Sequence, residues 1–211
     1  MSELFVLTER PAVYLASKSA RRQELLRQLG VEFESLLLRE ALGRRRDVVE
    51  APRKDESPIE YVKRVARLKA SVGWHRMGRR GLPPKPVLGA DTEVVLDGQA
   101  LGKPADAAGA VAMLAALSGR THEVLTAVAV RWQAQLVAAV STSRVTLRAI
   151  ARDEIERYVA TGESFDKAGG YAIQGRAAVF VQHLEGSYSG VMGLPLHETA
   201  EILARIGFPV I

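Results

Sequence analysis

The stretch that decides the fold lies in the middle of the chain, at residues 87–104, and reads VLGADTEVVLDGQALGKP. Its apolar residues 87–90 predict a strand that ends at the polar pair Asp91 and Thr92. The run EVVLDGQAL, which follows, predicts a strand with a tight turn at residues 97–98, because an Asp-Gly pair favours a β-hairpin turn. A carboxylate at a strand end faces the crevice where open α/β sheets bind ligands, so we expect Asp91 to lie at a ligand site.

Strands and helices are mixed on both sides of this stretch. Apolar runs predict strands at 13–16, 33–38 and 178–184, and an antiparallel pair at 121–131 and 136–148. Helical spacing of apolar residues predicts helices at 19–29, 57–72, 105–117, 153–162 and 195–207. The polar, basic segments 39–55 and 73–85 are expected to be loops. This mixture indicates an α/β protein, and we expect a single domain over residues 1–211.

Two of the expected helices begin with a capping box, in which a side chain at the helix start and a glutamate three residues later satisfy each other's backbone N–H groups. Ser57 and Glu60 form one, with Pro58 at the first helical position, where proline is favoured. Asp153 and Glu156 have the same spacing, so we expect a second capping box there.

The composition excludes several classes of protein. The 211 residues are 47% apolar and 25% charged, which is typical of a soluble globular protein. The absence of cysteine excludes a disulfide scaffold, a zinc ribbon and a thiol nucleophile. No apolar run approaches the roughly 20 residues of a membrane helix, and the N-terminus lacks the basic region of a signal peptide. We therefore expect a cytoplasmic protein that has no membrane partner.

The net charge of +5 is unevenly distributed along the chain. Between Arg39 and Lys85 there are 14 Lys and Arg residues against 6 Asp and Glu residues. Such a stretch is either a solvated basic face or a surface that attracts a polyanion, which can be a nucleic acid or a phosphorylated small molecule. No aromatic pattern of an RNA-binding sheet accompanies it, which argues against nucleic acid.

The segment SKSARR, residues 17–22, follows one predicted strand and opens a helix. A helix N-terminus offers free N–H groups and a partial positive charge to an anion. Arg21 and Arg22 are unfavourable so close to that positive end, and their presence is easier to understand if a phosphate binds there. The alternative is a pair of capping serines with two solvated arginines.

Three further polar clusters lie between the predicted elements. Asp91 can bind Mg²⁺ and position or deprotonate a water, or it can form an Asx turn. Lys103 is a charge for a phosphate or a solvated loop lysine. Gln174 lies in the glycine-rich stretch 166–175, where it can read a nucleobase edge, unless the stretch is only a flexible loop. The four histidines show no metal-ligand spacing and are expected to be surface or capping residues.

Taken in order along the chain, six segments resemble the Maf family of nucleoside triphosphate pyrophosphatases. They are YLASKSARRQELL (14–26), YVKRVARLKA (61–70), VLGADTEVVLDGQALGKP (87–104), LSGRTHEVLTAVAV (117–130), DKAGGYAIQG (166–175) and GSYSGVMGLPLHET (186–199). The form of the fifth segment is similar to that of the branch that cleaves dTTP and UTP. The resemblance implies a mixed, strongly twisted central sheet with flanking helices and two lobes around a cleft, as in the ITPase fold. It also suggests a homodimer.

The resemblance further implies the reaction and the roles of individual residues. Family members hydrolyse a nucleoside triphosphate to the monophosphate and pyrophosphate with a divalent cation, which can be Mg²⁺, Mn²⁺ or Co²⁺. Asp91 corresponds to the general base and a metal ligand. The substrate-binding positions are Ser17, Arg21, Arg22, Lys69, Thr92, Lys103 and Gln174, of which Arg21, Thr92 and Gln174 bear on substrate choice. Modified pyrimidine nucleotides are further candidate substrates.

A second metal-binding carboxylate is expected at Glu50. The stretch 39–49 looks like an insert relative to the family, so Glu40 remains the alternative. The first segment also departs from the family at Ala20, where a proline is usual, and at Lys18, where a small residue is common. The competing interpretation of the whole chain is a basic nucleic-acid-binding module without catalysis.

Overall fold

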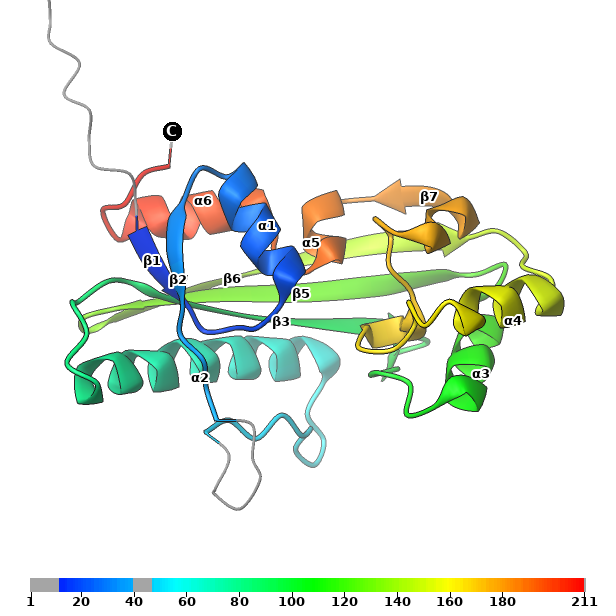
Figure 1. The fold of residues 1–211 in the computed structure, drawn as a ribbon, viewed down its shortest axis with the longest axis horizontal. Helices are drawn as coiled ribbons and strands as arrows, with labels where there is room; N and C mark the ends of the chain where they lie inside the picture. The colour runs from blue at the N-terminus through cyan, green and yellow to red at the C-terminus, as the bar shows by residue number, and fades with distance from the viewer. Residues whose placement is uncertain (1–11, 40–46, 211) are drawn as a thin grey trace, which may run out of the picture.

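The computed structural model describes residues 12–39 and 47–210, which contain one mixed sheet of seven strands. Six strands follow the order β2-β1-β3-β5-β6-β7, and β4 pairs with β3. The strands are β1 (Ala12–Leu15), β2 (Glu32–Ser35), β3 (Val87–Leu96), β4 (Gln99–Ala100), β5 (Thr121–Trp132), β6 (Gln135–Leu147) and β7 (Val181–Glu185). Figure 1 shows that β3, β5 and β6 run along most of the long axis.

Helices cover both faces of this sheet (Figure 1). They are α1 (Ala20–Gln28), α2 (Pro58–Arg79), α3 (Ala107–Leu117), α4 (Arg152–Ala160), α5 (Tyr188–Met192) and α6 (Leu196–Arg205). Successive residues of β5 point to opposite faces, as strand geometry requires. Val128 and Val130 share a core with α1 and α6, whereas Ala127 and Ala129 share another with α2.

The far end of the long strands carries a separate core. Leu114 of α3 packs there with Ile155 and Tyr158 of α4 and with Val124 of β5. The molecule therefore has two lobes that share the strands β3, β5 and β6. The predicted fold class, a mixed α/β sheet with flanking helices, is confirmed.

The expected strand end at Asp91 is wrong, because β3 continues through Asp91 to Leu96 without interruption. Its hairpin turn at residues 97–98 is confirmed, and both residues have the positive φ that this turn needs. The parallel partner β1, however, pairs with β3 only at Val87 and Leu88. Asp91 therefore lies just beyond the point where β3 loses one neighbour, so its side chain can still reach an opening in the sheet.

The predicted loop 73–85 is wrong over its first half, because α2 extends to Arg79 instead of ending near Val72. Gly73, the first residue of that predicted loop, lies within the helix and is one of the residues that let α2 approach the sheet, since a Cβ there would lie 2.7 Å from Cγ1 of Val87. Tertiary packing thus overrides the low helix propensity of glycine.

The second predicted capping box is also misplaced. The helix α4 begins at Arg152, and the Glu154 carboxylate accepts the backbone N–H of Ala151, the N-cap residue. Asp153 and Glu156 instead pair with Arg157 and Arg152, respectively. The capping box of Ser57 and Glu60 is confirmed.

Two strands are shorter than expected, since β2 ends at Ser35 and β7 begins at Val181 after a 3₁₀ turn, Arg176–Phe180. Across residues 12–39 and 47–210, we find no helix with the length and apolar character that crossing a membrane requires.

Candidate active site

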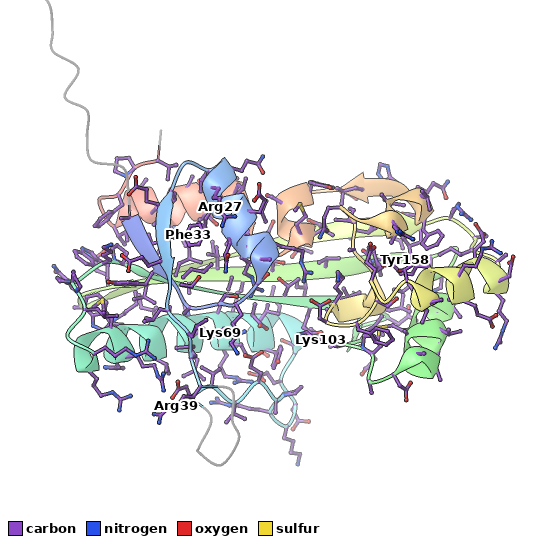
Figure 2. The ribbon with its side chains drawn as sticks, in the orientation of Figure 1. Arg27, Phe33, Arg39, Lys69, Lys103 and Tyr158 are labelled. Atoms are coloured by element: carbon purple, nitrogen blue, oxygen red, sulfur yellow. The ribbon has the colours of Figure 1, made fainter. Side chains whose placement is uncertain are left out.

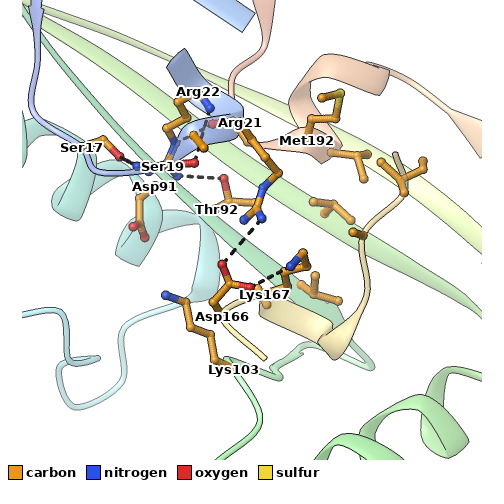
Figure 3. A pocket seen from close by; sticks show the side chains of 18 of the residues that line it. Ser17, Ser19, Arg21, Arg22, Asp91, Thr92, Lys103, Asp166, Lys167 and Met192 are labelled. Carbon is orange, nitrogen blue, oxygen red and sulfur yellow. Dashed lines mark hydrogen bonds and ion pairs between the residues drawn. The ribbon is translucent and has the colours of Figure 1, made fainter. Parts of the chain in front are cut away.

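One cavity of about 740 Å³ opens between the two lobes. Its lining comes from the α1 N-terminus, α2 and the segment before it, strands β3 and β5, the loop after β4, and the segments 166–174 and 191–193. Nine residues that the sequence singled out line it together: Ser17, Arg21, Arg22, Glu50, Lys69, Asp91, Thr92, Lys103 and Gln174. Figure 3 labels Ser17, Arg21, Arg22, Asp91, Thr92 and Lys103 around the opening. Glu40, the alternative to Glu50, lies outside the described residues.

Lys69 joins the two carboxylates of the cavity. Its Nζ donates to Oδ1 of Asp91 at 2.8 Å and lies 3.1 Å from Oε1 of Glu50. Asp91 and Lys69 are both buried, whereas the Glu50 side chain is about half exposed. Burial raises the pKa of Asp91, and the neighbouring Lys69 and Arg22 cations oppose that effect.

Gly89 makes the contact between Lys69 and Asp91 geometrically feasible. A Cβ at this position would lie 2.6 Å from the Ala66 carbonyl oxygen and 2.6 Å from the Ala70 nitrogen. Because it has none, α2 lies directly on β3, and Lys69 of the helix reaches Asp91 two residues further along the strand. Lys69 and Asp91 were both predicted as site residues, but nothing in the local sequence indicates that α2 lies so close to β3 at Gly89.

Arg22 connects several segments of the cavity wall through hydrogen bonds. Its Nε donates to the Gly193 carbonyl oxygen at 2.8 Å, and its two terminal nitrogens donate to Ser17 Oγ at 3.2 Å and Thr92 Oγ1 at 3.3 Å. The hydroxyl of Thr126 connects Thr92 to the same region, since it lies 3.0 Å from Thr92 Oγ1 and 2.7 Å from the Gly190 carbonyl oxygen. These bonds tie the start of α1 to β3, β5 and α5.

Further cations gather where α1 faces the segment 166–174 (Figure 3). Arg21 lies 4.0 Å from the carboxylate of Asp166, and Lys167 donates to the same carboxylate at 2.7 Å. Lys103 lines the cavity from the loop that follows β4. Such a concentration of Arg and Lys side chains suits a polyanionic ligand.

One part of the cavity lining is less charged. Tyr171, Ala172 and Ile173 form its wall next to Gln174, with Val94 and Val124 nearby. The Tyr171 hydroxyl is hydrogen-bonded to Nε2 of His122 at 2.7 Å. An apolar wall with a few polar groups is typical of a site that holds an aromatic or heterocyclic ring.

His122 is not the surface or capping residue that the sequence suggested. It is only 2% exposed, and burial lowers its pKa to about 4, so the ring is neutral near pH 7. Its Nδ1 is buried and lacks a hydrogen-bond partner within residues 12–39 and 47–210. Alternation along β5 places it on the face that packs behind Tyr171.

The donor set fits a hard divalent cation that arrives with its ligand. Carboxylate oxygens are the atoms that Mg²⁺ prefers, and Mg²⁺ is usually bound by one or two carboxylates together with substrate phosphates. Asp91 and Glu50 are two such carboxylates, both within contact of one Lys69 ammonium. In the part of the chain that the structure describes, no cluster of three or more His, Asp or Glu side chains is arranged for a metal.

The sequence did not single out two residues that the structure places at or beside the site. Lys167 lines the cavity and lies within the motif at 166–175, so its position in that motif was the available signal. Glu93 lies two residues after Asp91 on β3 and accepts the backbone N–H of Gly102, next to Lys103. Burial and then the charge of Asp91 raise the pKa of Glu93 to about 7.

Several cations of the basic stretch are engaged within the fold. Asp47 pairs with Arg39 and with Arg76, and Glu56 pairs with Arg64. Lys69 is inside the cavity. These contacts favour a structural role over a surface for nucleic acid in the described part of the stretch.

The chain resembles known proteins over nearly its full length. The family model described as Maf-like protein matches residues 12–206. A dTTP/UTP pyrophosphatase of Nitrosomonas europaea is 53% identical over 198 residues, which cover 94% of this chain and 96% of that protein. A dTTP/UTP pyrophosphatase of Cupriavidus metallidurans is 57% identical over 195 residues, which cover 92% of this chain and 96% of that protein.

Among solved structures, the Staphylococcus aureus Ham1 protein is similar to 64% of this chain and 71% of its own, with 14% sequence identity and a TM-score of 0.44.

Proposed function

Since the chain belongs to the Maf family, we propose that it hydrolyses dTTP and UTP to the nucleoside monophosphate and pyrophosphate. The predicted family is confirmed by the match over residues 12–206. The predicted class of enzyme, a nucleoside triphosphate pyrophosphatase, agrees with the names of relatives that are more than half identical.

The observation that carries the proposal is the contact of Lys69 with Asp91 and Glu50 inside a cavity that is lined by cations. A triphosphate bears about four negative charges, and positioned cations offset the repulsion between that charge and an attacking water. Arg21, Lys103 and Lys167 line the cavity from three different segments, and in this proposal they supply those cations. This combination is unusual for a passive binding surface, which has no need of a buried carboxylate.

In this proposal Asp91 accepts the proton of the attacking water. The water adds to the α-phosphorus, the bond from that phosphorus to its bridging oxygen breaks, and pyrophosphate leaves. Burial makes Asp91 a better base than an exposed aspartate, and Lys69 holds its carboxylate in place. Asp91 and Glu50 would hold a divalent metal, such as Mg²⁺, Mn²⁺ or Co²⁺, which supplies Lewis-acid stabilisation of the phosphate charge.

Gln174 is proposed to read the base. Uracil and thymine present an N3–H donor next to a carbonyl acceptor, and a glutamine amide can accept from the first and donate to the second. Cytosine has an acceptor at N3, so it would leave one polar group unpaired, and a site of this kind discriminates strongly against such an analogue. Modified pyrimidines that keep the uracil edge are further candidate substrates.

A nucleotide panel tests the proposal directly. Pyrophosphate release is measured for UTP, dTTP, CTP, ATP and GTP, with Mg²⁺, Mn²⁺ or Co²⁺ and with a chelator. We expect UTP and dTTP to be cleaved ahead of the others, and the chelator to abolish turnover. Replacement of Gln174 by alanine should reduce the preference for UTP over CTP. A wild-type preference for a purine would contradict the assignment of the base.

The substitution Asp91→Asn tests the proposed base. It keeps the size of the side chain but removes the charge, so kcat for UTP should fall by at least about 10²-fold. The control is Asp97→Asn in the hairpin turn, where asparagine accommodates the positive φ and activity should be unchanged. Near-normal turnover by Asp91→Asn would rule out Asp91 as the base.

A further inference from the structure

Residues 171–174, which form the less charged part of the cavity wall, are held from outside by two side chains. Tyr158 of α4 is 4% exposed, and its hydroxyl accepts the backbone N–H of Ala172 at 3.3 Å. The same hydroxyl donates to Oε1 of Glu163 at 2.9 Å. Figure 2 shows Tyr158 in the lobe that contains α3 and α4, away from Lys69 on α2. Tyr158 and Glu163 are absent from the cavity lining, so neither is placed to touch the ligand.

Glu163 holds the other end of the same segment. Its Oε2 accepts the backbone N–H of Arg176 at 3.1 Å, and its Oε1 lies within 3.5 Å of the Ala177 nitrogen. The carboxylate fills the space beside Gly175, where a Cβ would lie 2.6 Å from its Cδ. Gly175 has an ordinary negative φ, so a Cβ there would displace the Glu163 carboxylate without straining the backbone.

The two anchors bracket Gln174, one on each side of it in the sequence. Ala172 is fixed through Tyr158, and Arg176 and Ala177 are fixed through Glu163. Burial and the bond to Glu163 raise the pKa of Tyr158, so its hydroxyl keeps the proton that it donates. A glutamine can select one base edge over another only if its backbone is held to within a fraction of an ångström.

We propose that Tyr158 and Glu163 are positioning residues for base selection, which hold residues 171–174 so that Gln174 meets the pyrimidine edge. The inference rests on the proposed hydrolysis of UTP and dTTP and adds α4 to the parts of the protein that determine the substrate. Arg21, Lys103 and Asp91 lie on other elements, and Lys167 precedes the residues that the pair holds. The pair should therefore affect the choice of base and leave the chemical step intact.

Three substitutions disturb the anchor from different sides. Tyr158→Phe removes the hydroxyl but keeps the ring that packs on Phe180, with centroids 5.5 Å apart. Glu163→Gln replaces one accepting oxygen by a donor, and Gly175→Ala displaces the carboxylate from the loop side. The matched control is Glu154→Gln, because Glu154 also belongs to α4 and accepts a backbone N–H, at Ala151, but does not contact residues 171–177.

The experiment measures kcat and KM for UTP and CTP by pyrophosphate release, together with the melting temperature of each variant. We expect the ratio of kcat/KM for UTP to that for CTP to fall about 3- to 10-fold in all three variants, as for the loss of one hydrogen bond. The change should come from a higher KM for UTP, with kcat nearly unchanged. Glu154→Gln should lower the melting temperature but keep the wild-type ratio.

A wild-type ratio in all three variants, while wild-type protein cleaves UTP, would overturn the inference and leave the proposed function intact. An equal loss of kcat on UTP and CTP would also overturn it, because it would show a general structural role. Absence of pyrophosphate release from UTP by the wild-type protein would instead remove the proposed function, and the inference with it.

Discussion

At the scale of single residues, the cations around the cavity differ in what already engages them. Arg22 donates to three protein oxygens, which makes it a part of the cavity wall as much as a ligand-binding group. Among residues 12–39 and 47–210, the ion pair of Arg21 is with the exposed carboxylate of Asp166, at 4.0 Å. Arg21 can therefore turn toward a phosphate with little loss of existing bonds.

We predict that Arg21→Ala and Lys103→Ala each lower kcat/KM for UTP. The loss of transition-state stabilisation should be about 1.5–3 kcal/mol, which is the usual range for hydrogen bonds to charged groups. Steady-state kinetics on the purified variants measure this. Arg152→Ala serves as the control, since that side chain is 83% exposed and pairs with Glu156 on the surface. Unchanged kcat/KM in both site variants would mean that these cations are merely solvated.

Among single residues, His122 makes the stability of the folded protein depend on pH. Its pKa is lowered from 6.5 to about 4 by burial, so below pH 6.5 the unfolded chain takes up a proton that the folded protein does not. The neutral, buried ring therefore contributes its full share to the free energy of unfolding above pH 6.5. This contribution is lost as the pH falls from 6.5 toward 4, and the loss is up to about 3 kcal/mol.

Urea unfolding at neutral pH and at about pH 4.5 measures the loss, since the free energy of unfolding follows proton uptake. In His122→Gln this part of the pH dependence should disappear. His197→Gln, at a side chain that is 80% exposed, should keep the wild-type dependence. Parallel pH curves for wild type and His122→Gln would contradict the prediction.

At the scale of elements, the contact between α2 and β3 determines whether the site exists. Gly89→Ala would place a Cβ 2.6 Å from the Ala66 carbonyl oxygen and 2.8 Å from Cβ of Lys69. Because backbone atoms cannot give way as a flexible side chain does, helix and strand must separate. We expect the free energy of unfolding to fall by about 1–3 kcal/mol, as for overpacked cores, and UTP turnover to fall with it as Lys69 leaves Asp91.

Gly78→Ala provides the contrast within the same helix. A Cβ there meets nothing within 4 Å, and alanine has the better helix propensity. This variant should be more stable than wild type by about 0.5–1 kcal/mol and fully active. Chemical unfolding and the UTP assay on both glycine variants give the comparison, and equal destabilisation by the two would contradict it.

At the scale of the whole molecule, the cavity is built from both lobes. One lobe contributes α1 and α2, and the other contributes the segment 166–174. A ligand that bridges them should therefore stabilise the protein as a unit. At 100 times its Kd, a non-hydrolysable UTP analogue should increase the free energy of unfolding by about 2.7 kcal/mol. For a protein of this size, that increase corresponds to a rise in melting temperature of about 5–10 °C. A purine analogue at the same concentration should give a smaller shift, and an equal shift would contradict the proposed choice of pyrimidine.

Local sequence determined the features that depend on neighbouring residues alone. The capping box at Ser57 and Glu60 was predictable because its two bonds connect residues three positions apart. The hairpin at residues 97–98 was predictable because only certain residues adopt positive φ readily. The order of six motifs also indicated the family and drew attention to the nine residues that line the cavity.

The tertiary structure decided what depends on contacts between distant segments. The predicted end of α2 near residue 72 came too early, and so did the predicted strand end at Asp91, because a propensity contains no information about the neighbour that compensates for it. Lys69 and Asp91 are 22 positions apart, and their contact depends on the missing Cβ of Gly89. Tyr158 accepts the backbone N–H of Ala172, which lies 14 residues further along the chain. Such pairings arise only when folding closes the loops between them, so their positions follow from packing and not from local pattern.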